Sequence, residues 1–137
     1  MELDVYISGK ITGEDTLASK VKFLEMQMRL LGMDVHTVTN PHLLGITDKW
    51  PWDKAMDKCL EVLSKGHNTI IMLNDYADSK GALRELEMAE KLGLLIVFEH
   101  QVDDLYALAK AKFKNINTPT KVSPKQTWRD TSNIEFP

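Results

Sequence analysis

The feature that most constrains the fold is an alternation of short strand-like runs with segments of helical periodicity. Four runs have the length of strands, at 3–8, 34–39, 69–73 and 94–98. The run TIIML at 69–73 is apolar throughout, which is typical of strands buried on both faces of a parallel sheet. Between the runs, apolar residues recur every three or four positions, as in helices. The alternation predicts an α/β sheet with right-handed crossovers.

We expect a flavodoxin-like or Rossmann-like open parallel sheet with strand order 2-1-3-4, room for a fifth strand, and helices on both faces. Helices are expected at 16–31, from 51 to Gly66, from Ser79 to Gly93, and at 102–113. Apolar residues at three- and four-residue spacing are expected to turn the first helix toward the core: Leu17, Val21, Leu24, Met28 and Leu31. The inner face of the second is expected to carry Ala55, Cys59, Leu60 and Leu63.

The length of 137 residues fits one domain, which we place at 1–113. The remaining segment, 114–137, is polar and has little helical periodicity. We expect this tail to pack on the domain or on a neighbouring subunit, with Trp128 and Phe136 as its anchors.

Composition argues against several classes of protein. The formal net charge is -3 and the basic residues are scattered, so a polymeric nucleic acid is not an expected partner. The N-terminus has no signal-peptide pattern and no apolar run is long enough to cross a bilayer, which favours a cytoplasmic protein without membrane contact. Cys59 is the only cysteine, and no cysteine and histidine cluster has metal-ligand spacing. We therefore expect no metal and no cofactor, and assign the four histidines no role.

Two loops are candidates for a ligand site, because doubly wound sheets bind ligands at the carboxyl ends of the strands where strand order reverses. The first, SGKITG after strand one, offers the Ser8 hydroxyl, the amides of Gly9 and Gly13, and the Lys10 cation, which suit an anion. It lacks the spacing of a P-loop or of GxGxxG. An ordinary strand-to-helix turn explains the loop equally well.

The second loop, NDYADSKG after strand three, leads into a helix that contains Glu85. Ser79 is a natural N-cap, and the free amides at the helix start, including that of Gly81, would attract a phosphate. Glu85 lies one turn further, on the same face as Gly81 and Ala89. The spacing leaves two interpretations open: a carboxylate that a substrate can reach, or a solvated acid that merely favours the helix N-terminus.

The joint occurrence of Tyr6-Ile-Ser-Gly9 and Ser79-Lys-Gly81-Ala-Leu-Arg-Glu85 at the ends of strands one and three resembles the nucleoside 2-deoxyribosyltransferase superfamily. That superfamily includes 2'-deoxynucleoside 5'-monophosphate N-glycosidases, and the similarity extends from Met1 to about Phe98. The resemblance implies that Glu85 is the nucleophile and that Tyr6 orients it. It also implies that the loop from Ser8 to Gly13, Ile11 included, receives the phosphate or 5'-group.

The resemblance further implies a general acid on or near the second helix, for which Asp57 is the nearest candidate, ahead of Asp53, Glu61 and Asp75. It also implies a homo-oligomer in which a neighbour completes the pocket. Ser79 stands where the transferases acting on free nucleosides carry an aspartate. Because a second anion would repel a phosphate, Ser79 favours a nucleotide substrate.

Three further side chains could contact the substrate. Trp52, beside Trp50 and Pro51, could stack on a base or instead pin its loop to the core. Asn40 could contact the sugar, although an Asn-Pro turn explains it equally well. Asp75 lies in the second loop and is placed among the substrate-binding candidates.

The expected function is cleavage or transfer at the N-glycosidic bond of a (deoxy)nucleoside 5'-monophosphate. The alternatives are deoxyribosyl transfer between free nucleosides, a nucleotide-binding or sensing module without catalysis, and cleavage of an NAD-type N-glycoside. Tyr6 and Glu85 discriminate between catalysis and binding alone. A separation too large for a hydrogen bond, together with the absence of an acid that faces the base, would favour binding alone.

Overall fold

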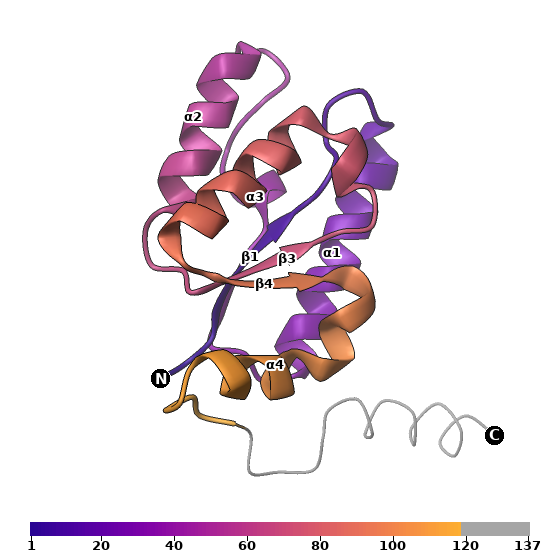
Figure 1. Ribbon diagram of the computed structural model, residues 1–137. Coiled ribbons are helices and arrows are strands. Elements are labelled where there is room, and N and C mark those ends of the chain that lie inside the picture. The colour runs from indigo at the N-terminus through magenta and orange to yellow at the C-terminus, as the bar shows by residue number, and fades with distance from the viewer. Residues whose placement is uncertain (119–137) are drawn as a thin grey trace, which may run out of the picture.

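The structure, a computed structural model, describes residues 1–118 of the 137-residue chain. Its centre is a sheet of four parallel strands in the order β2-β1-β3-β4 (Figure 1). The strands are β1 (Asp4–Ser8), β2 (Thr37–Thr39), β3 (Thr69–Met72) and β4 (Leu95–Phe98). The predicted α/β class and the order 2-1-3-4 are confirmed. Residues 1–118 contain no fifth strand.

Helices cover both faces of the sheet (Figure 1). One face carries α1 (Thr16–Gly32) and α4 (Leu105–Lys112), and the other carries α2 (Trp52–Leu63) and α3 (Lys80–Leu92). Three short 3-10 helices lie in the connections: η1 (Pro41–Leu43), η2 (Tyr76–Asp78) and η3 (Glu99–Asp104). Asp15 caps α1 by accepting a hydrogen bond from the Ala18 amide, and Gly93 ends α3 in the left-handed conformation.

The alternation of side chains along β1 divides its residues between the two faces. Val5 and Ile7 pack in the core beneath α1 and α4. Tyr6 packs in the other core, beneath α2 and α3. Because successive strand residues point to opposite faces, Ser8 lies on the same side as Tyr6. The strand thus directs two hydroxyl groups toward α3.

The prediction for the core face of α1 was wrong. The expected residues, Leu17, Val21, Leu24, Met28 and Leu31, are 46 to 69% exposed. The helix instead buries Ser19, Phe23, Met26 and Leu30 against the sheet. Both sets recur at three- and four-residue spacing on opposite sides of the helix, so helical periodicity alone does not distinguish them.

The start of the tail packs near the N-terminus. Ile116 is buried in the α1 and α4 core, and the Asn117 amide donates a hydrogen bond of 2.8 Å to the Met1 carbonyl. Trp128 and Phe136, the predicted anchors, lie outside the described residues. Within residues 1–118, no helix combines the length and apolarity needed to span a bilayer.

The burial of α1 generates a stability prediction. Leu30→Ala should lower the free energy of unfolding by about 2 to 5 kcal/mol, because the truncation opens a cavity in the core. Leu92→Ala, which truncates the 47% exposed leucine at the end of α3, is the matched control and should cost less than about 1 kcal/mol. Urea denaturation measures both values. Equal losses of unfolding free energy in the two variants would contradict the packing of Leu30 in the core.

Candidate active site

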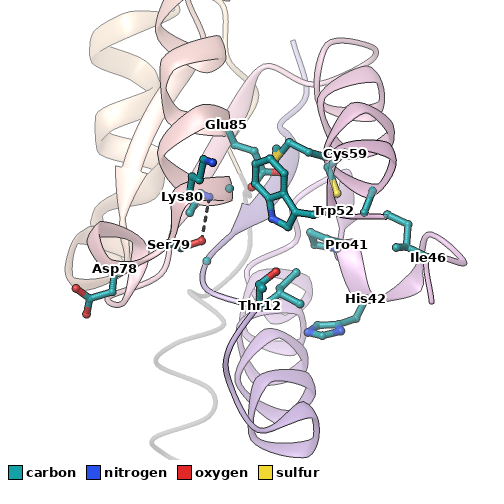
Figure 2. A pocket seen from close by; sticks show the side chains of 16 residues that line it. Thr12, Pro41, His42, Ile46, Trp52, Cys59, Asp78, Ser79, Lys80 and Glu85 are labelled. Atoms are coloured by element: carbon teal, nitrogen blue, oxygen red, sulfur yellow. Dashed lines mark hydrogen bonds between the residues drawn. The ribbon is translucent and has the colours of Figure 1, made fainter. Parts of the chain in front are cut away.

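A cavity of about 580 Å³ opens beyond the carboxyl ends of β1 and β3, between α2 and the start of α3 (Figure 2). Its walls come from the loop after β1, the connection from β2 to α2, α2 itself and the N-terminal half of α3. The lining residues are Gly9, Ile11, Thr12, Pro41, His42, Ile46, Trp52, Ala55, Met56, Cys59, Asp78, Ser79, Lys80, Gly81, Ala82 and Glu85. The volume lies within the usual range of small-molecule sites.

Glu85 lines this cavity although its residue is only 5% exposed. The Tyr6 hydroxyl donates a hydrogen bond to Oε2 of the carboxylate, and the Ser8 hydroxyl donates one of 2.7 Å to Oε1. Both donors come from one face of β1, since they are two residues apart on a strand. Each carboxylate oxygen therefore has one hydroxyl partner and keeps acceptor capacity for a ligand.

Burial sets the protonation states around Glu85. It raises the pKa of Glu85 to about 7, against the opposing effect of the hydrogen bonds from Ser8 and Tyr6. Burial, reinforced by the nearby Glu85 charge, raises the pKa of Tyr6 well above its ordinary value and that of Cys59 to about 11. At neutral pH, Tyr6 and Cys59 are protonated while Glu85 titrates. The arrangement can supply a desolvated carboxylate as a base or a nucleophile.

The first predicted loop is only partly in the cavity. Gly9 and Ile11 line it, whereas Ser8, Lys10 and Gly13 do not. A Cβ at Gly9 would lie 2.8 Å from Cδ1 and 3.0 Å from Cβ of Leu73, so any larger residue would force Leu73 to shift. The backbone at Gly9 therefore passes close to the residue that follows β3, at the edge of the cavity.

Asp75 joins the two predicted loops and does not line the cavity. Its carboxylate accepts a hydrogen bond of 3.0 Å from the Lys10 amide and forms an ion pair with the Lys22 ammonium. Lys22 also donates to the Lys10 carbonyl at 3.1 Å and contacts Glu14 at 2.9 Å. Burial raises the pKa of Asp75, but the hydrogen bonds from Lys22 and the Lys10 amide, together with the Lys22 charge, outweigh burial and lower the pKa below its ordinary value. Asp75 and Lys22 thus connect the two loops, and we call this pair of residues the clamp.

The second predicted loop forms the cavity wall opposite α2. The Ser79 hydroxyl accepts a hydrogen bond of 3.0 Å from the Ala82 amide and so caps α3, as predicted (Figure 2). A Cβ at Gly81 would lie 3.3 Å from Sδ of Met56, so this glycine also permits close packing of α2 on α3. Asp78 and Lys80 add one negative and one positive side chain to the same wall.

Trp52 lines the cavity from the first turn of α2, whereas Trp50 does not. The ammonium of Lys80 lies 4.9 Å from the centroid of the Trp52 ring, a cation–π contact that joins α2 to α3. Figure 2 shows the indole among the lining side chains, between Lys80 and Cys59 in this view. The tryptophan thus contacts the other helix and forms part of the wall.

Asn40 and Asp57 also lie outside the cavity. Asn40 is buried and uses both side-chain groups: Oδ1 accepts from the His42 amide at 3.0 Å and Nδ2 donates to Gln27 at 3.1 Å. The structure favours its interpretation as an Asn-Pro turn residue. Asp57 is exposed and is not among the lining residues, because α2 turns Ala55, Met56 and Cys59 inward. The structure does not bring Asp57 to Glu85.

His42 is a lining residue that sequence reasoning missed. Its Nε2 lies 2.8 Å from the Ser19 hydroxyl, and its ring packs edge-on against Phe23. Burial, with Lys20 and Lys22 nearby, lowers the pKa of His42 below its ordinary value. Its position after the Asn40-Pro41 turn, beyond the end of β2, was the available signal.

A family model matches most of the chain. Residues 3–98 match the family described as domain of unknown function DUF4406. The chain belongs to this family. The DUF4406 region begins just before β1 and ends with β4, so it contains every residue that lines the cavity. No curated protein matches the chain.

The burial of Glu85 generates a prediction about stability. The folded state keeps the Glu85 proton up to about pH 7, whereas the unfolded state releases it near the ordinary value of 4.5. Wild-type stability should therefore fall as the pH rises through this window. Glu85→Gln has no titrating carboxyl at this position. Its free energy of unfolding should therefore exceed that of the wild type by roughly 3 kcal/mol at pH 8, but by only about 1 kcal/mol at pH 5.

Urea denaturation at pH 5 and pH 8 measures this difference. The matched control is Glu87→Gln, an exposed glutamate on the same helix that is paired with Lys91. This variant should show no such pH-dependent gain. A Glu85→Gln variant that tracks wild type at both pH values would contradict the raised pKa.

Proposed function

We propose that the protein cleaves or transfers at the N-glycosidic bond of a (deoxy)nucleoside 5'-monophosphate, through a covalent glycosyl-enzyme on Glu85. The observation that supports it is the Glu85 carboxylate, buried at the cavity wall and bound by the Tyr6 and Ser8 hydroxyls. Burying an ionisable group costs stability, so a buried carboxylate that faces a cavity favours a chemical role over a structural one.

The proposed reaction has two displacements. An oxygen of Glu85 forms a bond to the anomeric carbon while the carbon–nitrogen bond breaks, and the base leaves with the electron pair and takes up a proton. Water or a second base then attacks the same carbon and releases Glu85. The hydrogen bonds from Tyr6 and Ser8 hold the carboxylate in one orientation, which keeps its nucleophilic oxygen directed at the sugar.

The start of α3 suits the 5'-phosphate. Ser79, Lys80 and Gly81 line the cavity at a helix N-terminus, where amide groups and the positive end of the helix dipole favour an anion. Gly81 and Glu85 are four residues apart, about 6 Å along the helix axis. A 5'-phosphate and an anomeric carbon are separated by a comparable length of sugar, so one nucleotide could reach both.

The wall opposite α3 suits a planar base. It is formed by apolar side chains from α2 and the connection before it, namely Pro41, Ile46, Trp52, Ala55 and Met56. Apolar and aromatic surfaces of this kind bind the faces of bases without strong sequence discrimination. The resemblance to the nucleoside 2-deoxyribosyltransferase superfamily agrees with this division of the cavity into phosphate, sugar and base regions.

A nucleotide-binding protein without turnover is the second candidate function. It is favoured by the position of Asp57, which is exposed and outside the cavity. Asp57 therefore does not lie where it could protonate the leaving base, the role that the resemblance implies for an acid on or near the second helix. Asp78 is the other carboxylic acid, besides Glu85, among the lining residues of the described chain. The two candidates differ in whether free base appears.

The first test is base release. The protein is incubated with ribo- and deoxynucleoside 5'-monophosphates, the matching nucleosides and NAD, and free base is measured by liquid chromatography. We expect release from at least one monophosphate and slower release from its nucleoside, which lacks the phosphate contacts. Glu85→Gln should lower the rate by about a thousandfold or more, because the nucleophile is lost. Glu87→Gln is the matched control and should release base at the wild-type rate.

Two results would count against catalysis by Glu85. Release that survives Glu85→Gln at the wild-type rate would exclude this residue as the nucleophile. No release from any substrate, together with calorimetric binding of a monophosphate, would favour the binding protein.

The pH profile is a second prediction. Because the nucleophile must be ionised, kcat/KM should rise with pH and level off above about pH 7, the pKa of Glu85. Tyr6→Phe removes a hydrogen bond that lowers this pKa, so the rise should move to higher pH by about one unit. Initial rates from pH 5 to 9 measure both profiles. A rate that falls through pH 7 would contradict an ionised Glu85.

A further inference from the structure

The outer face of α1 is an apolar stripe. Five large side chains at alternating four- and three-residue spacing form it: Leu17, Val21, Leu24, Met28 and Leu31. Each is 46 to 69% exposed. Together they expose roughly 500 Å², which is near the upper end of the apolar patches found on monomeric proteins. Patches of that size are often functional.

The opposite face of the same helix is buried in the core of the monomer. Ser19, Phe23, Met26 and Leu30 are buried against the sheet. A helix that is apolar on two opposite faces is typical of a helix buried on both sides. Among residues 1–118, the five side chains of the stripe stay largely exposed, so no element of the described chain buries it.

The spacing of the stripe is that of a two-stranded coiled coil. Residues 17, 24 and 31 recur every seven positions, and residues 21 and 28 lie between them, which corresponds to positions d and a of a heptad. The stripe runs almost the whole length of α1, from Leu17 near its start to Leu31 at its end. It can therefore pair with one other helix of the same pattern along about four turns.

We infer that α1 pairs in parallel with α1 of a second copy of this chain to form a homodimer. In a parallel pair, position g of one helix faces position e of the next heptad on its partner. Those positions are Lys20 and Glu25, both exposed on α1. Twofold symmetry makes this contact twice, and each contact joins opposite charges. The stripe alone exposes roughly 500 Å², below the roughly 800 Å² that each partner buries in a standard interface, and the flanking residues add to it.

The inference is independent of the proposed function, since it uses no residue that lines the cavity. Its first test is the oligomeric state of the full chain by sedimentation equilibrium, where a dimer is expected. Leu24→Lys combined with Met28→Lys should weaken the dimer at least about a hundredfold, because four apolar side chains per dimer are replaced by positively charged ones. Leu92→Lys, at a comparably exposed leucine on α3, should leave the dimer intact.

Charge exchange tests the parallel orientation. Lys20→Glu should raise the dissociation constant about tenfold, because two attractive pairs become repulsive. Adding Glu25→Lys to the same chain should restore the wild-type value. Circular dichroism of the variants monitors folding, which these exposed positions should not change.

Cross-linking gives an independent test in the full chain carrying Cys59→Ser. Leu17→Cys should form an intermolecular disulfide on mild oxidation, because a parallel pair brings residue 17 next to residue 17 of its partner. In an antiparallel pair these residues would lie about 21 Å apart along the axis. A wild-type monomer, whether the stripe stays open or residues 119–137 cover it, would overturn the proposal. So would a dimer that survives the two lysine substitutions, or a dimer in which Leu17→Cys does not cross-link.

Discussion

The hydrogen bonds from Tyr6 and Ser8 to the Glu85 carboxylate are the interaction on which the rest of the site depends. They join β1 at the middle of the sheet to α3 on its face, across 77 and 79 residues of chain. Without them, a buried carboxylate beneath α3 would be unpaired, which costs several kcal/mol. With them the charge is tolerated, but burial still raises the pKa of Glu85 to about 7. The site therefore holds a carboxylate near its point of ionisation at neutral pH.

Close packing around this carboxylate shapes the cavity. Gly9 lets the loop after β1 pass over Leu73, and Gly81 lets α2 approach α3 at Met56. The clamp of Asp75 and Lys22 ties the two loops together on the side away from α2. The cavity thus lies between the loops that follow β1 and β3, which the clamp connects, and the helices α2 and α3, which are in contact through Trp52 and Lys80. A small-molecule site with a preformed wall follows from these contacts.

The two faces of α1 connect the fold to assembly. The face with Phe23 completes the core of the monomer, and the opposite face carries the stripe from Leu17 to Leu31. The helix follows the loop that contributes Gly9, Ile11 and Thr12 to the cavity. A partner on its outer face would hold the helix without covering Glu85, since Glu85 lies on the other side of the sheet with α2 and α3.

The sequence by itself determined the class of fold and the two loops, because periods of two and of about 3.6 residues are local properties. The strand order 2-1-3-4 was an expectation from the doubly wound class, and the structure confirms it. The helix-start pattern pointed to Ser79 and Gly81, and the resemblance pointed to Tyr6 and Glu85; the structure brings these residues to one site. Only the tertiary structure decided which face of α1 is buried, that Asp75 and Asn40 stabilise loops, that Asp57 lies outside the cavity, and that His42 lines it. The physical reason is that periodicity defines the faces of a helix, whereas the side chain a face meets depends on residues distant in the chain.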